Sequence, residues 1–317
     1  MNKIKVGVVG VGHIGREHAR IYSLLKNVEF VGVYDLDPSV GKRIAQTYNN
    51  RAFTKVEELI EAVDAVSIAT PTVSHYDVAK PFLEAGKHLL IEKPIAATPA
   101  TAKDLVYLAN QKKVVLQVGH IERFNPVLKT IESCLTRPKF IEAHRLSPYP
   151  GRSTDVGVVL DLMIHDLDVI LHLVRSPIAH IDAVGVAVLS KGEDIANARI
   201  RFQNGCVANV TTSRISPDKM RKIRLFQDDT YLSLDYQNQA GEIYRKIKSQ
   251  ITREKVPVEK QEPLFLQIAS FVECVHNKTM PVVSGEQGAA ALDIAIQITD
   301  LIWQDPSRKL EIPGTLG

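Results

Sequence analysis

The fold is decided by the stretch Ile4-Lys5-Val6-Gly7-Val8-Val9-Gly10-Val11-Gly12-His13-Ile14-Gly15. Ile4–Val9 is an apolar, mostly β-branched run, typical of a strand buried on both faces, and a helical pattern begins at His13. Between them stands a G-x-G-x-x-G motif, in which Gly10 permits a tight turn, Gly12 allows close approach of a pyrophosphate, and Gly15 allows close helix packing. The amides of Gly12, His13 and Ile14 are then expected to face a diphosphate at the helix N-terminus.

An acidic residue follows at the position that such a motif requires. Asp35 ends the second expected strand, Val28–Tyr34, and lies 20 residues after Gly15. A carboxylate there can accept hydrogen bonds from both hydroxyls of an adenosine ribose and repels a 2′-phosphate. Because Leu36 and not arginine follows, the sequence favours NAD over NADP. Asp37 is close enough to share the role, and the alternative is that Asp35 merely caps a loop.

The first 120 residues alternate between strands and helices. Further strands are expected at Ala65–Ala69, His88–Ile91 and Val114–Val118, with helical patterns between them. Strands that alternate with helices indicate βαβ units and a parallel sheet. We therefore predict an α/β Rossmann domain, a doubly wound parallel sheet, over residues 1–120.

The pattern changes after Gly119. Two helices are expected at Asn125–Leu135 and Val158–Val174, and two more close the chain at Leu264–His276 and Glu286–Trp303. Between these pairs lie extended runs separated by short turns, which indicate an antiparallel sheet. The expected runs are Ile178–Leu189, Ala196–Phe202, Cys206–Ser213, Lys222–Phe226, Tyr231–Tyr236 and Ile243–Ile247. Residues 121–317 are predicted to form an α+β domain for substrate binding and oligomerisation.

Composition excludes several classes of protein. Lys and Arg number 39 and Asp and Glu 36, a net charge of +3 that does not suggest a nucleic-acid partner. No apolar run approaches the roughly 20 residues that a membrane span needs. The scattered residues Cys134, Cys206 and Cys274 fit neither a disulfide framework nor a zinc cluster, and instead indicate free thiols in a reducing cytoplasm.

Two further motifs carry side chains capable of chemistry. Lys93, in Glu92-Lys93-Pro94, follows an expected strand at the sheet edge where ligands bind, although a surface lysine is an equal alternative. Asp161, His165 and Asp168 fall at i, i+4 and i+7 of an otherwise apolar helix. Buried charges are costly unless they are paired or used, so this face is either a site or a structural Asp–His pair. A metal site is disfavoured, because the ligands would come from one helix without cysteine support.

Together these motifs resemble the glucose–fructose oxidoreductase/inositol dehydrogenase/rhizopine catabolism (Gfo/Idh/MocA) family. The resemblance spans the whole chain and also includes Ala69-Thr70-Pro71 with His75. It implies a Rossmann domain followed by a domain with an open, mostly antiparallel sheet, through which homodimers or homotetramers form. By this resemblance Lys93, Asp161 and His165 match the catalytic trio. Thr70, Pro71 and His75 match the segment beside the nicotinamide half of NAD, and Glu92 and Lys93 are further expected cofactor contacts.

One segment indicates a branch of the family. The stretch His120-Ile121-Glu122-Arg123-Phe124-Asn125-Pro126 resembles the branch that oxidises UDP-N-acetylglucosamine at C3, whereas Met163 replaces a glycine that many members have. Arg123 and Arg152 are candidates for binding a substrate diphosphate, because guanidinium groups bind phosphate oxygens in pairs. The alternative is that each is an ordinary solvated arginine. Asn125 and Asp168 are further substrate candidates.

The expected reaction is hydride transfer from a secondary alcohol of a sugar or sugar nucleotide to NAD. His165 is the preferred base because its ordinary pKa is near 6.5, with Lys93 stabilising the developing negative charge, but the reverse assignment stays open. Asp161 is expected to position one of these two. The alternatives are an inositol or other free-sugar dehydrogenase, an NAD-using glycosidase that returns the hydride, and a non-catalytic dinucleotide sensor.

Overall fold

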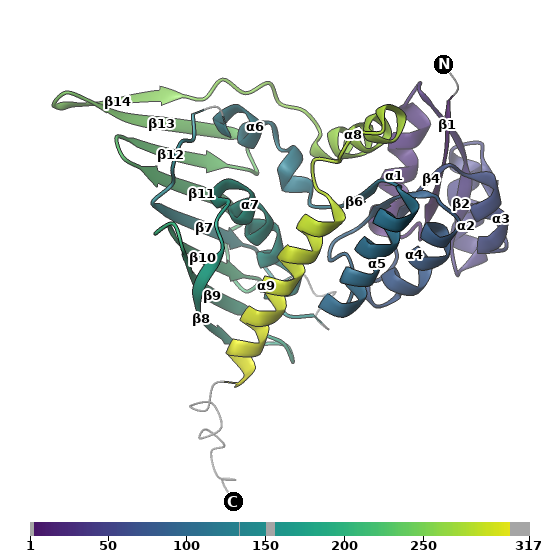
Figure 1. Ribbon diagram of the computed structural model, residues 1–317, viewed down its shortest axis with the longest axis horizontal. Coiled ribbons are helices and arrows are strands. Elements are labelled where there is room, and N and C mark those ends of the chain that lie inside the picture. Colours follow the sequence, from purple (N-terminus) through teal and green to yellow (C-terminus); the bar gives the residue numbers. More distant parts are fainter. Residues whose placement is uncertain (1–2, 133, 150–155, 305–317) are drawn as a thin grey trace, which may run out of the picture. The chain divides into compact units, whose positions relative to one another are not determined.

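The computed structural model describes residues 3–132, 134–149 and 156–304 (Figure 1). The chain forms two compact units, of which unit 1 is Met1–Asn125 with Lys260–Leu292 and unit 2 is Pro126–Glu259 with Asp293–Gly317. The chain therefore returns to unit 1 near its end, which the predicted division into 1–120 and 121–317 does not include. None of the described helices is both long enough and apolar enough to cross a lipid bilayer.

Unit 1 contains a parallel sheet with the strand order β3-β2-β1-β4-β5-β6, as predicted for a doubly wound fold. The order reverses between β1 and β4, and ligands of such sheets bind at the carboxyl ends of the strands beside that reversal. The strand bounds are β1 Ile4–Val9, β2 Val28–Tyr34, β3 Arg51–Ala52, β4 Ala65–Ile68, β5 His88–Ile91 and β6 Leu116–Val118.

Helices complete unit 1 and include one from the end of the chain. Helix α8 packs against α1 because its Ile268 and Phe271 belong to the same buried core as Ile21 and Tyr22 of α1. Figure 1 shows α8 beside α1 and α5 beside α4. The helix bounds are α1 His13–Leu24, α2 Pro38–Thr47, α3 Val56–Ala62, η1 Thr72–Ser74, α4 His75–Glu84, α5 Pro99–Lys112, η2 Ile121–Phe124 and α8 Pro263–Asn277. Helix α9, Gly285–Gln304, begins in unit 1 and ends in unit 2.

Unit 2 contains an eight-stranded sheet with the order β14-β13-β12-β11-β7-β10-β9-β8. Among its described strands, β7 and β10 pair in parallel and every other pairing is antiparallel, which confirms the predicted sheet type. The bounds are β7 Phe140–Leu146, β8 Ile178–Val186, β9 Ile195–Phe202, β10 Val207–Ser213, β11 Met220–Gln227, β12 Thr230–Asp235, β13 Ala240–Ile247 and β14 Gln250–Lys255.

The two faces of this sheet differ in what covers them. Alternate residues such as Ile141, Ala143 and Leu232 are fully buried. Over them lie α6 (Pro126–Glu132), the π-helical turn η3 (Val159–Met163) and α7 (Ile164–Val174), all on one side of the sheet in Figure 1. The intervening residues of the same strands point to the opposite face and are half-exposed.

Candidate functional site

The glycine-rich turn has the geometry that a dinucleotide site needs. Gly10 has a φ of 77°, and a Cβ there would lie 2.8 Å from the Thr70 side chain. A Cβ on Gly15 would overlap the Gly10 carbonyl oxygen, so both positions require glycine. By contrast, nothing lies within 4 Å of the Cβ position of Gly12, so the backbone there is open to an approaching group.

The amides at the start of α1 are available to an anion. The Arg16 N–H donates to the Gly12 carbonyl across the first turn of α1 (3.2 Å). The preceding amides, those of His13 and Ile14, have no intrahelical acceptor, and the helix dipole favours negative charge in front of them. The open backbone at Gly12 and the amides beside it therefore fit a diphosphate, and its binding there stays a prediction.

Asp35 is fixed beside this turn. Its Oδ2 accepts the N–H of Val11 (2.8 Å) and its Oδ1 accepts the N–H of Asp37 (2.9 Å). Asp37 instead caps α2, because its carboxylate accepts hydrogen bonds from the amide and the hydroxyl of Ser39. Those two hydrogen bonds lower the pKa of Asp37. Asp35 therefore suits a ribose better than Asp37, which the sequence left as an alternative.

His75 links two loops at the same edge of the sheet. Its Nδ1 lies 2.8 Å from the Pro94 carbonyl oxygen and its Nε2 lies 2.9 Å from the Thr70 carbonyl oxygen. Burial lowers the pKa of this imidazole, although the two carbonyl contacts act in the opposite direction. Both ring nitrogens face backbone carbonyls, which joins the Thr70-Pro71 segment to the loop that carries Lys93. The predicted cofactor contacts of Thr70, Pro71 and His75 stay predictions.

Glu92 is held on two sides. His18, a fully buried residue of α1, places its Nε2 3.1 Å from Glu92 Oε1. On the other side a Cβ on Gly119 would lie 2.6 Å from the same oxygen, so glycine makes room for the carboxylate. The next residue, half-buried Lys93, precedes a cis peptide bond to Pro94. His18 was not identified from the sequence. Its position one helical turn after Gly15 could have indicated a residue close to the cofactor site.

The segment after β6 carries four buried polar side chains, of which His120 lies near Lys93. His120, Glu122, Arg123 and Asn125 are all buried. The Asn125 Nδ2 donates to Glu122 Oε2 (3.4 Å), and an Arg123 N–H donates to the Val282 carbonyl (3.0 Å). Burial, with the positive charges of Lys93 and Arg123 as smaller causes, lowers the pKa of His120 to about 3. His120 is therefore neutral near pH 7 and adds no positive charge beside Lys93.

The remaining predicted side chains lie in unit 2. Asp161 is in the π turn η3, and His165 and Asp168 follow in α7. Asp161 and His165 are half-buried, and Asp168 is buried. The predicted regular helix therefore widens at its first turn, and such π turns often occur at functional positions. Arg152 lies outside the described residues.

Helix α7 is anchored to the sheet by an ion pair that the sequence did not predict. Arg145 of β7 donates from Nε to Asp166 Oδ2 (2.7 Å) and from a terminal nitrogen to Oδ1 (3.0 Å). Both side chains are almost fully buried. A two-pronged pair of this kind fixes the rotation of the helix, because a guanidinium meets a carboxylate in one plane. Asp166 directly follows His165.

The predicted catalytic residues are divided between the two units: Lys93 belongs to unit 1, and Asp161 and His165 to unit 2. In the part of the chain that the structure describes, no three His, Cys, Asp or Glu side chains are grouped as metal ligands.

Comparison with known proteins gives the class. Residues 4–120 match the family described as "Oxidoreductase family, NAD-binding Rossmann fold", and residues 130–232 match the "GFO/IDH/MocA C-terminal domain". The chain belongs to the Gfo/Idh/MocA family of NAD-binding oxidoreductases, as the resemblance implied.

Individual relatives are similar to this chain over nearly its full length. The chain is 35% identical to the UDP-N-acetylglucosamine 3-dehydrogenase of Acidithiobacillus ferrooxidans over 94% of this chain and 97% of that protein. A solved structure of that enzyme has a TM-score of 0.91 and covers 95% of this chain and 98% of its own. The myo-inositol 2-dehydrogenase of Thermotoga maritima is 23% identical, over 97% of this chain and 99% of its own. A levoglucosan dehydrogenase complexed with NADH and L-sorbose shares the fold, with a TM-score of 0.87 at 17% identity, over 96% of this chain and 98% of its own.

Proposed function

We propose that this protein oxidises a secondary alcohol of a sugar nucleotide with NAD, specifically C3 of UDP-N-acetylglucosamine, to give the 3-keto sugar nucleotide. The observation that carries the proposal is the 35% identity, over nearly the whole of both chains, to an enzyme named for that reaction. The proposal is also supported by the stretch from His120 to Pro126, from which the sequence predicted this branch: His120, Glu122, Arg123 and Asn125 are buried, and His120 lies close enough to Lys93 to be affected by its charge.

The reaction needs a base and a group that stabilises the carbinol oxygen. We assign the base to His165, whose ordinary pKa suits neutral pH, and the stabilising ammonium to Lys93. Lys93 is the base in the alternative assignment. Asp161 orients one of these two side chains. When bound, NAD supplies the carbon that accepts the hydride, and the open turn at Gly12 with the carboxylate of Asp35 holds the dinucleotide.

A substrate diphosphate would need cations and its sugar would need polar partners. Arg123 and Arg152 are the proposed phosphate ligands, and Asn125 and Asp168 the proposed sugar ligands. Arg123 is buried, and one of its N–H groups donates to the Val282 carbonyl (3.0 Å).

Assembly through the half-exposed face of the eight-stranded sheet is part of the proposal. Four half-exposed aromatic rings run across its strands, with centroids 5.7 Å apart for Phe140–Phe226, 4.7 Å for Phe226–Tyr231 and 5.0 Å for Tyr231–Tyr244. A second copy would bury this aromatic row, and burial of aromatic area dominates interface energies. Light scattering should give the mass of a dimer or tetramer, and Tyr231→Glu should lower it. A monomeric wild-type protein at micromolar concentration would exclude this assembly.

A cytoplasmic location is also proposed. It is supported by the cysteines, none of which forms a disulfide in the described structure. Cys206 and Cys274 are buried, and burial raises the pKa of the Cys206 thiol to about 11, so it is an inert core residue.

The test is a substrate panel with NAD, in which the formation of NADH is followed by absorbance. UDP-N-acetylglucosamine should give stoichiometric NADH, whereas free N-acetylglucosamine and myo-inositol should give little. NADH with myo-inositol alone would instead identify a free-sugar dehydrogenase. Product without net NADH would identify an enzyme that returns the hydride, and NAD binding without turnover of any substrate would identify a sensor.

A further inference from the structure

The carboxylate of Glu193 joins the start of the helix that carries Asp161 to the end of the chain's last described helix. Its backbone carbonyl accepts the N–H of Val158 (3.0 Å), and its Oε1 accepts the N–H of Val159 (3.1 Å). Its Oε2 accepts the indole N–H of Trp303 in α9 (3.1 Å). Glu193 is buried, so each oxygen needs these donors.

Two glycines make this contact possible. A Cβ on Gly157 would overlap the Glu193 carboxylate, and a Cβ on Gly192 would lie 3.0 Å from the Cα of Gly157. The loop that precedes η3 and the loop that precedes β9 therefore touch through positions without side chains. Any larger residue at Gly157 would push the carboxylate away from the Val159 amide.

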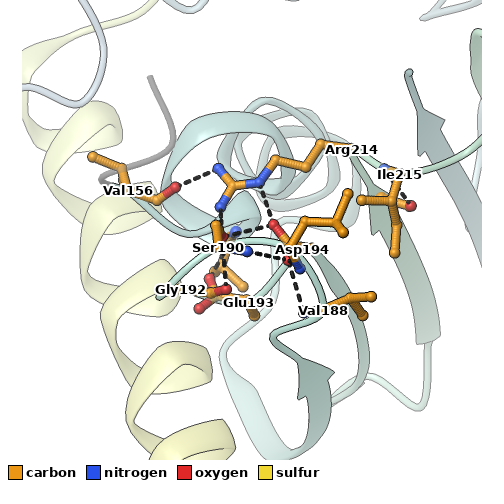
Figure 2. A network of polar contacts seen from close by, with 11 residues as sticks. Val156, Val188, Ser190, Gly192, Glu193, Asp194, Arg214 and Ile215 are labelled. Atoms are coloured by element: carbon orange, nitrogen blue, oxygen red, sulfur yellow. Dashed lines mark hydrogen bonds and ion pairs between the residues drawn. The ribbon is translucent and has the colours of Figure 1, made fainter. Parts of the chain in front are cut away.

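The residue after Glu193, Asp194, forms a buried ion pair with Arg214. Arg214 donates from Nε to Asp194 Oδ1 (2.8 Å) and from its terminal nitrogens to the Val156 carbonyl and the Ser190 hydroxyl (2.6 Å each). Figure 2 shows the guanidinium between Val156 on one side and Asp194 and Ser190 on the other. The second oxygen of Asp194 accepts the amides of residues 188–190. The network thus ties together the segments on both sides of the contact.

The π turn η3 needs a hydrogen-bond acceptor for its first amides, and Glu193 provides one. The opening amides of a helix have no intrahelical acceptor, and a carboxylate at that end also interacts favourably with the helix dipole. A π turn closes wider rings than an α turn and has little stability of its own. Asp161 lies two residues after Val159, whose amide Glu193 accepts.

We propose that Glu193 is a positioning residue, which fixes the π turn and thereby the side chains of Asp161 and His165, and that Trp303 binds the second oxygen of the same carboxylate. The inference rests on the proposed catalytic roles of Asp161 and His165. Glu193 does not touch the reacting groups, so its removal changes the turnover number and leaves the affinity of unit 1 for NAD unchanged.

Three single variants of the full-length protein distinguish the contact of Glu193 with the Val159 amide from its contact with the Trp303 indole. Glu193→Ala removes both side-chain bonds, and kcat should fall roughly 10- to 100-fold, the cost of a misplaced reacting group, with the KM for NAD within about 2-fold. Glu193→Gln keeps an oxygen for the Val159 amide and should recover most of kcat. Trp303→Phe removes only the outer bond and should keep kcat within about 3-fold.

Two further readouts do not depend on turnover. Amide hydrogen exchange over 158–163 should speed up in Glu193→Ala and not in Trp303→Phe. Trp303 is the only tryptophan in the sequence, so a shift of its fluorescence emission in Glu193→Ala reports loss of the indole contact. Gly157→Ala should reproduce the exchange and kcat effects if Glu193→Ala does not fold.

Wild-type kcat and wild-type exchange in both Glu193→Ala and Gly157→Ala would overturn the inference. Equal losses of kcat and of NAD affinity would also overturn it, because they would indicate a general loss of structure. If Lys93→Ala and His165→Ala kept full activity, the proposed catalytic roles on which the inference rests would fail. Faster exchange in Glu193→Ala would then still support the structural contact.

Discussion

His18 and Glu92 meet inside unit 1, with the imidazole Nε2 3.1 Å from the carboxylate Oε1, and this contact connects the glycine-rich turn to the loop of Lys93. His18 is fully buried, and Glu92 is largely covered. The helix that opens at the dinucleotide turn therefore also fixes the residue before the proposed catalytic lysine.

Replacing His18 should destabilise the protein and weaken NAD binding. His18→Phe leaves the Glu92 carboxylate without this donor, which should cost about 1–3 kcal/mol in the free energy of unfolding. Urea denaturation measures it. The matched control is His13→Ala on the same helix, because His13 is exposed and should change stability by less than about 0.5 kcal/mol. Equal effects of the two variants would contradict a specific role for His18.

Asp35 should set the choice of cofactor. Asp35→Ala removes the carboxylate beside the Val11 amide, so the KM for NAD should rise roughly 10- to 100-fold, as expected for lost charged hydrogen bonds. The rate with NADP should rise relative to NAD, since the repulsion of a 2′-phosphate is gone. Initial rates with both cofactors measure this. An unchanged NAD/NADP preference would exclude the ribose role.

The Arg145–Asp166 pair should matter far more to stability than an exposed pair. Arg145→Met removes the guanidinium that pairs with the buried Asp166, and the free energy of unfolding should fall by about 3–5 kcal/mol. The control is Arg224→Met, which breaks the exposed pair with Glu142 (2.9 Å) and should cost about 1 kcal/mol or less. Similar losses in the two variants would contradict the anchoring role of Asp166.

Much of the fold could be predicted because its signals are local. The β-branched run Ile4–Val9 and the Thr98-Pro99 start of α5, where Thr98 accepts the Thr101 amide (3.2 Å), depend on neighbouring residues only. The regular alternation of β11–β13 likewise indicated strands without tertiary information. The family motifs also identified residues at the carboxyl edge of the parallel sheet of unit 1.

Other features depend on tertiary contacts and could not be predicted. Strand β7 was missed because Arg145 is buried at an inward position, where it is neutralised by a residue 21 positions away. Strand β14 was missed because nearly all its residues are exposed at a sheet edge, so it has no apolar alternation. The return of α8 to unit 1 depends on the core it shares with α1, and the π turn at Asp161 leaves no pattern in the sequence.

Acid should weaken the Asp194–Arg214 network. Burial alone would raise the pKa of Asp194, but hydrogen bonds from Ser190, backbone amides and Arg214 outweigh it and lower the pKa. A lowered folded-state pKa stabilises the protein above the ordinary value of about 3.9, and this contribution is lost as the pH falls below that value. The difference in unfolding free energy between wild type and Asp194→Asn should therefore shrink between pH 7 and pH 3.

The control for this pH effect is the exposed Asp182, which pairs with His180 (2.9 Å). Asp182→Asn should differ little from wild type at either pH, because exposed pairs contribute about 1 kcal/mol or less. A difference for Asp194→Asn that stays constant down to pH 3 would contradict the ionised state of Asp194.

The most direct test of the proposed reaction is the turnover of UDP-N-acetylglucosamine with NAD by Lys93→Ala and His165→Ala, compared with wild type. Each variant should lose roughly 10²–10⁴-fold in kcat, because each removes a group that handles the alcohol proton or its oxygen. NAD binding, measured by calorimetry, should stay nearly unchanged. Wild-type turnover by both variants would contradict the assignment of an ammonium and an imidazole to one reaction centre.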